Sequence, residues 1–68
     1  MEKWERIIRN NFKHLDKVSL DTVVAIFAMG IEERSVYSLD KDYILEYCDK
    51  FCKYAGLPKM ENIKSLKN

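Results

Sequence analysis

The stretch from Lys41 to Ala55, KDYILEYCDKFCKYA, decides the fold because its apolar residues recur with helical spacing. Placed at about 100° per residue, they cover an arc of roughly 200° around a helix axis. A helix that covers one side of a small core needs an apolar stripe of only about 100° or slightly more. The surplus apolar surface, led by Tyr43, Tyr47 and Tyr54, therefore predicts contact with another molecule.

Both ends of this stretch carry helix-terminus signals. Asp40 is a favoured N-cap residue and stands directly before the periodic pattern. At the other end, Gly56 and Leu57 match a Schellman C-cap, and Pro58 then prevents the helix from continuing. A helix is predicted over Lys41–Ala55.

A second amphipathic helix is predicted from about Lys3 to Lys17. Its apolar residues recur at helical spacing and form one stripe: Trp4, Ile7, Ile8, Phe12 and Leu15. Its basic residues would stack on the opposite face at i, i+3, i+7 and i+11: Arg6, Arg9, Lys13 and Lys17.

A short helix between these two is predicted from Thr22 to Met29, with Asp21 as its N-cap. Gly30 followed by Ile31 has the pattern of a Schellman C-cap, which favours a helix over a buried strand. Because this segment is apolar on every side, we expect it to be buried all round.

These elements predict an all-α fold, a compact three-helix domain with or without a short fourth helix at its carboxyl end. The 68 residues form a single small helical domain, near the lower size limit for one core. Residues 59–68 carry Met60, Ile63 and Leu66 at a spacing of three. This spacing is typical of a marginal helix or a flexible tail.

The composition is that of a globular chain, with 47% hydrophobic and 34% charged residues. The longest apolar run, Val23 to Met29, is too short to span a membrane. The first residues mix charges and do not form a secretory signal. Cys48 and Cys52 stand one helical turn apart and fit two reduced thiols. A cytoplasmic protein without membrane contact is predicted.

The sequence favours a protein without enzymatic activity. It has one histidine, His14, and no Gly-rich phosphate loop, nucleophile motif or pair of catalytic carboxylates. Cys48 and Cys52 would need two more ligands to hold zinc, and we interpret them as small apolar residues of the core. No catalytic residue, metal ligand or cofactor is predicted.

Residues 22–41 resemble a helix-turn-helix unit, with Gly30 at the turn and Ile31, Val36 and Leu39 packing inward. The resemblance implies DNA binding, in which Arg6, Arg9, Lys13 and Lys17 would contact the phosphate backbone. The segment departs from the pattern in carrying Ile26 where a small residue is usual, and Glu32 and Glu33 at outward positions.

The distribution of charge argues against nucleic acid as a partner. Residues 18–46 hold two basic and six acidic groups, a net charge of −4. Residues 1–17 carry +2 and residues 47–68 carry +3, which gives the overall +1. Because phosphate contacts dominate DNA affinity, an acidic reading segment is a poor match for DNA.

The favoured function is a small protein-binding regulator or inhibitor that acts through the Lys41–Ala55 helix and the acidic central segment. Its partner would be a second copy, giving a homodimer, or a host regulatory protein. The candidate contact residues are Tyr43, Tyr47, Phe51, Tyr54, Glu32 and Glu33. The competing interpretation places the tyrosines at the margin of the core.

A DNA-binding transcriptional regulator or DNA accessory protein is the alternative function. The content of Lys, Asn, Ile and Tyr is compatible with a regulator from a phage or mobile element.

Overall fold

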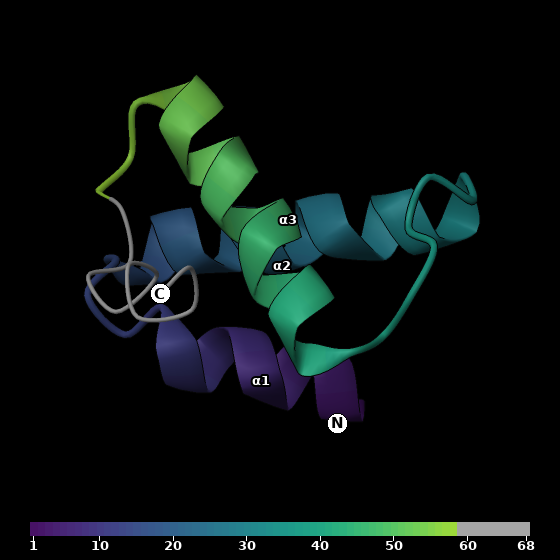
Figure 1. The fold of residues 1–68 in the computed structure, drawn as a ribbon. Helices are drawn as coiled ribbons and strands as arrows, with labels where there is room; N and C mark the ends of the chain where they lie inside the picture. The colour runs from purple at the N-terminus through teal and green to yellow at the C-terminus, as the bar shows by residue number, and fades with distance from the viewer. Residues whose placement is uncertain (59–68) are drawn as a thin grey trace.

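The computed structural model describes residues 1–58, which form three helices and no strand. These are α1 (Lys3–Asn11), α2 (Lys17–Glu32) and α3 (Lys41–Ala55). Helices α1 and α2 run in opposite directions, and α3 crosses both of them (Figure 1). The predicted all-α domain of three helices is confirmed, and the prediction for residues 59–68 lies outside the described residues.

One apolar core joins the three helices. Phe27 of α2 is completely buried, and its ring lies 5.3 Å from the ring of Trp4 and 5.2 Å from that of Tyr47. The other buried apolar residues are Ile8, Phe12, Leu15, Val23, Val24, Ile44, Leu45, Cys48 and Cys52.

Helix α1 is shorter than predicted and ends at Asn11 instead of Lys17. Phe12 leaves the helical conformation at φ −121° and ψ 34°, yet its side chain is buried, as is that of Leu15. The apolar pattern therefore continues into the connection after the helix itself has ended. The predicted stack of four basic residues on one helix is wrong, because Lys13 and Lys17 lie beyond α1.

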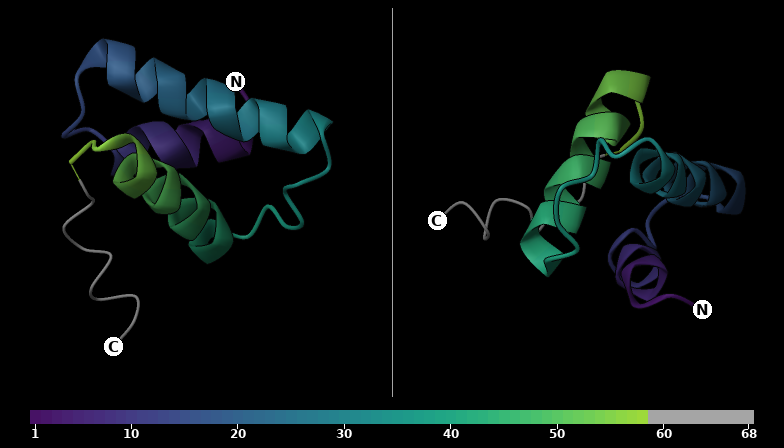
Figure 2. Two further views of the ribbon diagram at one scale, coloured as in Figure 1. Left: turned by 90° about the horizontal axis from the view of Figure 1, so that it is seen from above. Right: turned by 90° about the vertical axis from the view of Figure 1, so that its right-hand side faces the viewer.

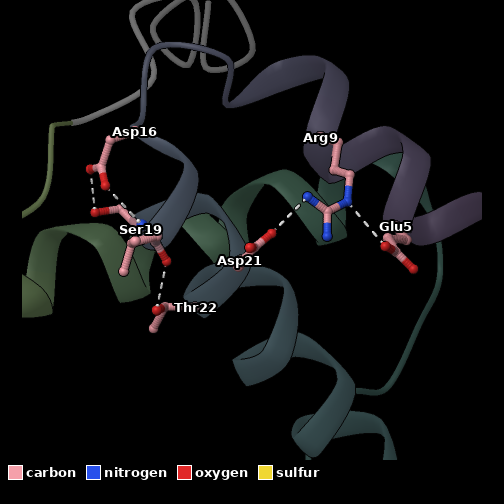
Figure 3. A network of polar contacts seen from close by, with 7 residues as sticks. Glu5, Arg9, Asp16, Ser19, Asp21 and Thr22 are labelled. Carbon is pink, nitrogen blue, oxygen red and sulfur yellow. Dashed lines mark hydrogen bonds and ion pairs between the residues drawn. The ribbon is translucent and has the colours of Figure 1, made fainter.

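Helix α2 begins five residues earlier than predicted, with Asp16 as its N-cap instead of Asp21. The Asp16 carboxylate accepts hydrogen bonds from the backbone N of Ser19 at 3.3 Å and from its Oγ at 2.6 Å. Asp16 thus caps the helix, because its carboxylate accepts a bond from a backbone N–H of the first turn. Asp21 lies inside the helix, where its carboxylate accepts a bond from Nη1 of Arg9 at 3.0 Å (Figure 3).

The predicted C-cap at Gly30 is also wrong, because α2 continues to Glu32. The Schellman bonds do form, but around Arg34, which adopts a left-handed φ of 61°. The Ser35 N–H donates to the Gly30 carbonyl at 2.9 Å, and the Arg34 N–H donates to that of Ile31 at 3.2 Å. Gly30 thus supplies a carbonyl to the motif from inside the helix.

Residues 33–40 connect α2 to α3 without forming a helix. The second helix of the helix-turn-helix resemblance, expected over Ile31–Leu39, is therefore absent.

Helix α3 has the predicted bounds and the predicted caps. Asp40 accepts a bond from the Asp42 N–H at 3.2 Å. Gly56 is left-handed at φ 77°, and the Leu57 N–H donates to the Cys52 carbonyl at 2.8 Å.

Helix α2 is not buried all round, in contrast to the prediction. It lies at the edge of the bundle, with α1 and α3 both on its inner side (Figure 2). Its inner side chains belong to the core, whereas four residues of its outer face are exposed: Val18, Thr22, Ala25 and Met29. With only three helices, nothing in residues 1–58 covers this second face.

Candidate protein-binding surface

The predicted tyrosine stripe of α3 divides into two parts with different surroundings. At the N-terminal part, Tyr43 Oη accepts a hydrogen bond from the Tyr37 N–H at 3.2 Å. Tyr47 Oη lies 3.5 Å from Oγ of Ser35, and the Tyr47 ring packs edge-on against Phe27. Tyr43 and Tyr47 thus attach the 33–40 connection to α3, which is the core-margin role.

The C-terminal part of the stripe faces outward. Tyr54 is 92% exposed, in the last turn of α3. It borders an open hollow of about 360 Å³ between α2 and α3, whose lining residues are Ile26, Tyr47, Lys50, Phe51 and Tyr54. Three of the predicted contact residues, Tyr47, Phe51 and Tyr54, therefore meet at one site. Tyr43 does not line it.

The hollow has an apolar floor and charged margins. Lys50 is the charged member of its lining. Glu33 is the C-cap residue of α2 and follows Ile26 by seven residues. Glu32 and Glu33 are both exposed at the C-terminal end of that helix. Neither of the predicted acidic residues lines the hollow.

Sequence reasoning missed Ile26 and Lys50 as members of this surface. Ile26 belongs to the segment that the sequence predicts to be buried on all sides, but it is only partly buried. The sequence does carry a signal for this. Residues 22–31 contain no charge, so this segment has apolar side chains on every side, and a core this small can bury only one side of a helix. For Lys50, which belongs to the charged arc of α3, no sequence signal indicated a place beside the hollow.

The basic residues of the DNA-binding alternative belong to different elements and are not equally exposed. Arg6 and Arg9 lie on α1, Lys13 in the connection that follows it, and Lys17 at the start of α2. Arg9 forms ion pairs at 3.0 Å with Glu5 through Nε and with Asp21 through Nη1. The hydrogen bonds to Glu5 and then to Asp21 raise the pKa of Arg9 and hold its guanidinium between α1 and α2. Arg6, Lys13 and Lys17 are exposed.

The two thiols belong to the core. Cys48 and Cys52 are free and buried. Burial, with a smaller contribution from Cys52, raises the pKa of Cys48 to about 12, and burial also raises that of Cys52. Both groups are therefore protonated at neutral pH. Residues 1–58 contain no group of three or more His, Cys, Asp or Glu side chains that could hold a metal ion.

The histidine has a structural partner. Nε2 of His14 lies 3.0 Å from the carbonyl oxygen of Pro58, a separation at which the ring N–H donates to the oxygen. Its ring also lies 5.8 Å from that of Phe12. His14 thereby joins the α1–α2 connection to the end of the described chain.

None of the helices in residues 1–58 is long and apolar enough to cross a membrane. No family model, no curated protein and no solved structure matches this chain.

Proposed function

We propose that this chain is a small non-enzymatic protein-binding module that regulates or inhibits its partner. The observation that carries the proposal is the hollow between α2 and α3, bordered by Tyr54. An aromatic ring left 92% exposed contributes little to the fold, whereas tyrosines are enriched in protein interfaces and among their energetic hot spots.

The shape and charge of the hollow indicate what a partner presents to it. Ile26 and Phe51 offer apolar surface, and the opening accepts one apolar side chain of a partner as an anchor. Lys50 at the margin favours an acidic group beside that anchor. Glu32 and Glu33, further along α2, favour a basic group, so a partner with both charges around an apolar residue fits best.

The test is capture of partners by the immobilised full chain from a lysate of its native cells, compared between two tyrosine variants. Tyr54→Ala removes the ring that borders the hollow. Tyr37→Ala is the matched control, because Tyr37 is 83% exposed but lies in the 33–40 connection. Both variants should melt close to the wild type, since neither ring is buried.

We expect Tyr54→Ala to lose the proteins that the wild type retains and Tyr37→Ala to keep them. A hot-spot tyrosine of this kind is worth about 2 kcal/mol, or roughly a thirtyfold loss of affinity. Equal retention by all three proteins would exclude the hollow as the binding surface.

A further inference from the structure

Helix α2 has a second apolar face that the rest of residues 1–58 does not cover. Val18 is 75% exposed and Met29 is 51% exposed, and between them Thr22 and Ala25 are also exposed. These four residues follow one another at spacings of four, three and four. That spacing is the seam pattern of two helices that pack along their length.

The seam runs along most of a helix of 16 residues, about 24 Å long. Its two central positions, Thr22 and Ala25, are small, which lets a second helix approach closely. Ile26 and Ala28 flank the seam and extend its apolar width. The face therefore has the shape that another helix requires.

The charges at the two ends of α2 are placed against the dipole of their own helix. A helix favours acidic groups at its N-terminus and basic groups at its C-terminus. Here Lys17 stands in the first turn, while Glu32 and Glu33 stand at the last turn and the C-cap. Asp16, the N-cap residue, cancels the charge of Lys17, and Arg34 cancels one of the two glutamates. The N-terminal end therefore has no net charge, whereas the C-terminal end has a net charge of −1.

We propose that the outer face of α2 binds the same face of a second copy of this chain, with the two helices antiparallel. In the symmetric register, Val18 lies against Met29 of the second copy, and Thr22 lies against Ala25 of the second copy. Each of the four contacts along the seam then joins two apolar or small residues. The two-fold axis passes between the two central contacts.

The antiparallel direction is selected by the end charges. It places Glu32 and Glu33 of each copy beside the N-terminal end of the other α2, where the helix dipole is positive and the charges of Asp16 and Lys17 cancel. The same charges that are unfavourable for their own helix thereby become favourable for the neighbour. A parallel pair would instead bring the two acidic C-terminal ends together.

This interface goes beyond the proposed function because its four seam residues do not line the hollow. Ile26, Glu32 and Glu33 contribute to both surfaces. The hollow lies on the flank of α2, so a dimer would carry two of them. Self-association is measured on the purified full chain, whereas capture of other proteins is measured in lysate. The two proposals can therefore fail independently.

The test is sedimentation equilibrium of the purified chain from about 5 to 500 µM, a range that detects weak dimers. The wild type should rise from its monomer mass of 8.1 kDa toward twice that value. Ala25→Glu places a charge in the seam and should weaken the dimer by about tenfold or more. Asn10→Glu adds the same side chain at an exposed position of α1 and should leave the dimer intact.

The antiparallel register has a separate test by mixing two variants. Thr22→Glu and Ala25→Lys should each dissociate alone, but associate when mixed, since the two new charges face each other only in this register. A circular dichroism spectrum confirms that each variant, altered at an exposed position, keeps its helices.

Three results would overturn the proposal. The first is a wild type that stays at monomer mass over the whole range. The second is a dimer that Ala25→Glu leaves intact, or that Tyr54→Ala disrupts instead. The third is a failure of the two mixed variants to associate.

Discussion

The hydroxyl of Tyr47 occupies the space that a side chain at position 30 would need. A Cβ built on Gly30 would lie 2.5 Å from Tyr47 Oη and 2.8 Å from Cγ2 of Val36. Gly30 is buried in the last turns of α2, so its lack of a side chain is what allows α3 and the 33–40 connection to approach that helix.

Gly30→Ala should therefore destabilise the domain, although alanine is the better helix former by about 1 kcal/mol. Forcing a methyl group into an occupied site costs about 1–3 kcal/mol, and here it displaces the connection or the Tyr47 ring. Urea denaturation followed by circular dichroism measures the difference. Tyr47→Phe, which removes the hydroxyl, should recover part of the loss in the double variant. A more stable Gly30→Ala protein would contradict this account.

The error at Gly30 shows what the sequence can and cannot decide. A glycine followed by an apolar residue fits a C-cap, and at Gly56 that interpretation is correct. At Gly30 the same pattern marks a close contact with Tyr47, which comes from another helix and is invisible to a local pattern. The left-handed residue of the Schellman motif is instead Arg34, a residue type that local propensity would not select.

The bounds of α3 could be predicted because all of its signals are local: the periodicity, Asp40 and Gly56. The different surroundings of its tyrosines could not be predicted in this way. A tyrosine side chain lies at the margin of the core when another segment of the chain packs against it, and it is free to contact a partner when none does. Only the fold shows that the 33–40 connection packs against Tyr43 and Tyr47. Tyr54 extends beyond that connection and remains exposed.

Phe27→Ala should be the most destabilising truncation in α2. Its ring is fully buried between Trp4 and Tyr47, so its removal leaves a cavity that costs about 3–5 kcal/mol. Ile26→Ala, at the edge of the hollow, should cost clearly less because Ile26 is only partly buried. Denaturant midpoints of the two variants give the comparison, and equal losses would show that the core is centred elsewhere.

No tight, sequence-specific binding to DNA is expected from the isolated chain. The connection after α2 forms no reading helix, and Arg9 is held by Glu5 and Asp21. A mobility-shift titration in about 0.15 M salt should show at most weak association that disappears as salt is raised. Nanomolar affinity for one DNA site would favour the DNA-binding function over the protein-binding function.

The cap at Asp16 predicts a specific dependence of stability on pH. Bonds from the Ser19 side chain and then its backbone lower the pKa of Asp16 in the folded state. A lowered pKa contributes stability that is present above the unfolded value of about 3.9 and is lost as the pH falls through the folded value.

The melting temperature of the wild type relative to Asp16→Asn should therefore fall as the pH is lowered from about 6 to about 2.5. Asparagine also caps helices but does not titrate, so the difference isolates this one carboxylate. Glu46→Gln, at an exposed position of α3, is the control. A difference between wild type and Asp16→Asn that does not change with pH would show that the cap bonds do not depend on the charge.

The thiols of α3 should remain unreactive until the domain opens. With the pKa of Cys48 at about 12, the reactive thiolate is roughly 10⁻⁴ of the population at pH 8, compared with about a quarter for an ordinary thiol. Cys52 is likewise buried with a raised pKa, so neither sulfur is both accessible and ionised.

Labelling with a thiol reagent at pH 8, followed by mass spectrometry, should be slow in buffer and fast in guanidinium. Gly30→Ala should accelerate it through its loss of stability, whereas Tyr37→Ala should not. Rapid labelling of the wild type in buffer would place at least one thiol at the surface and would remove Cys48 and Cys52 from the core.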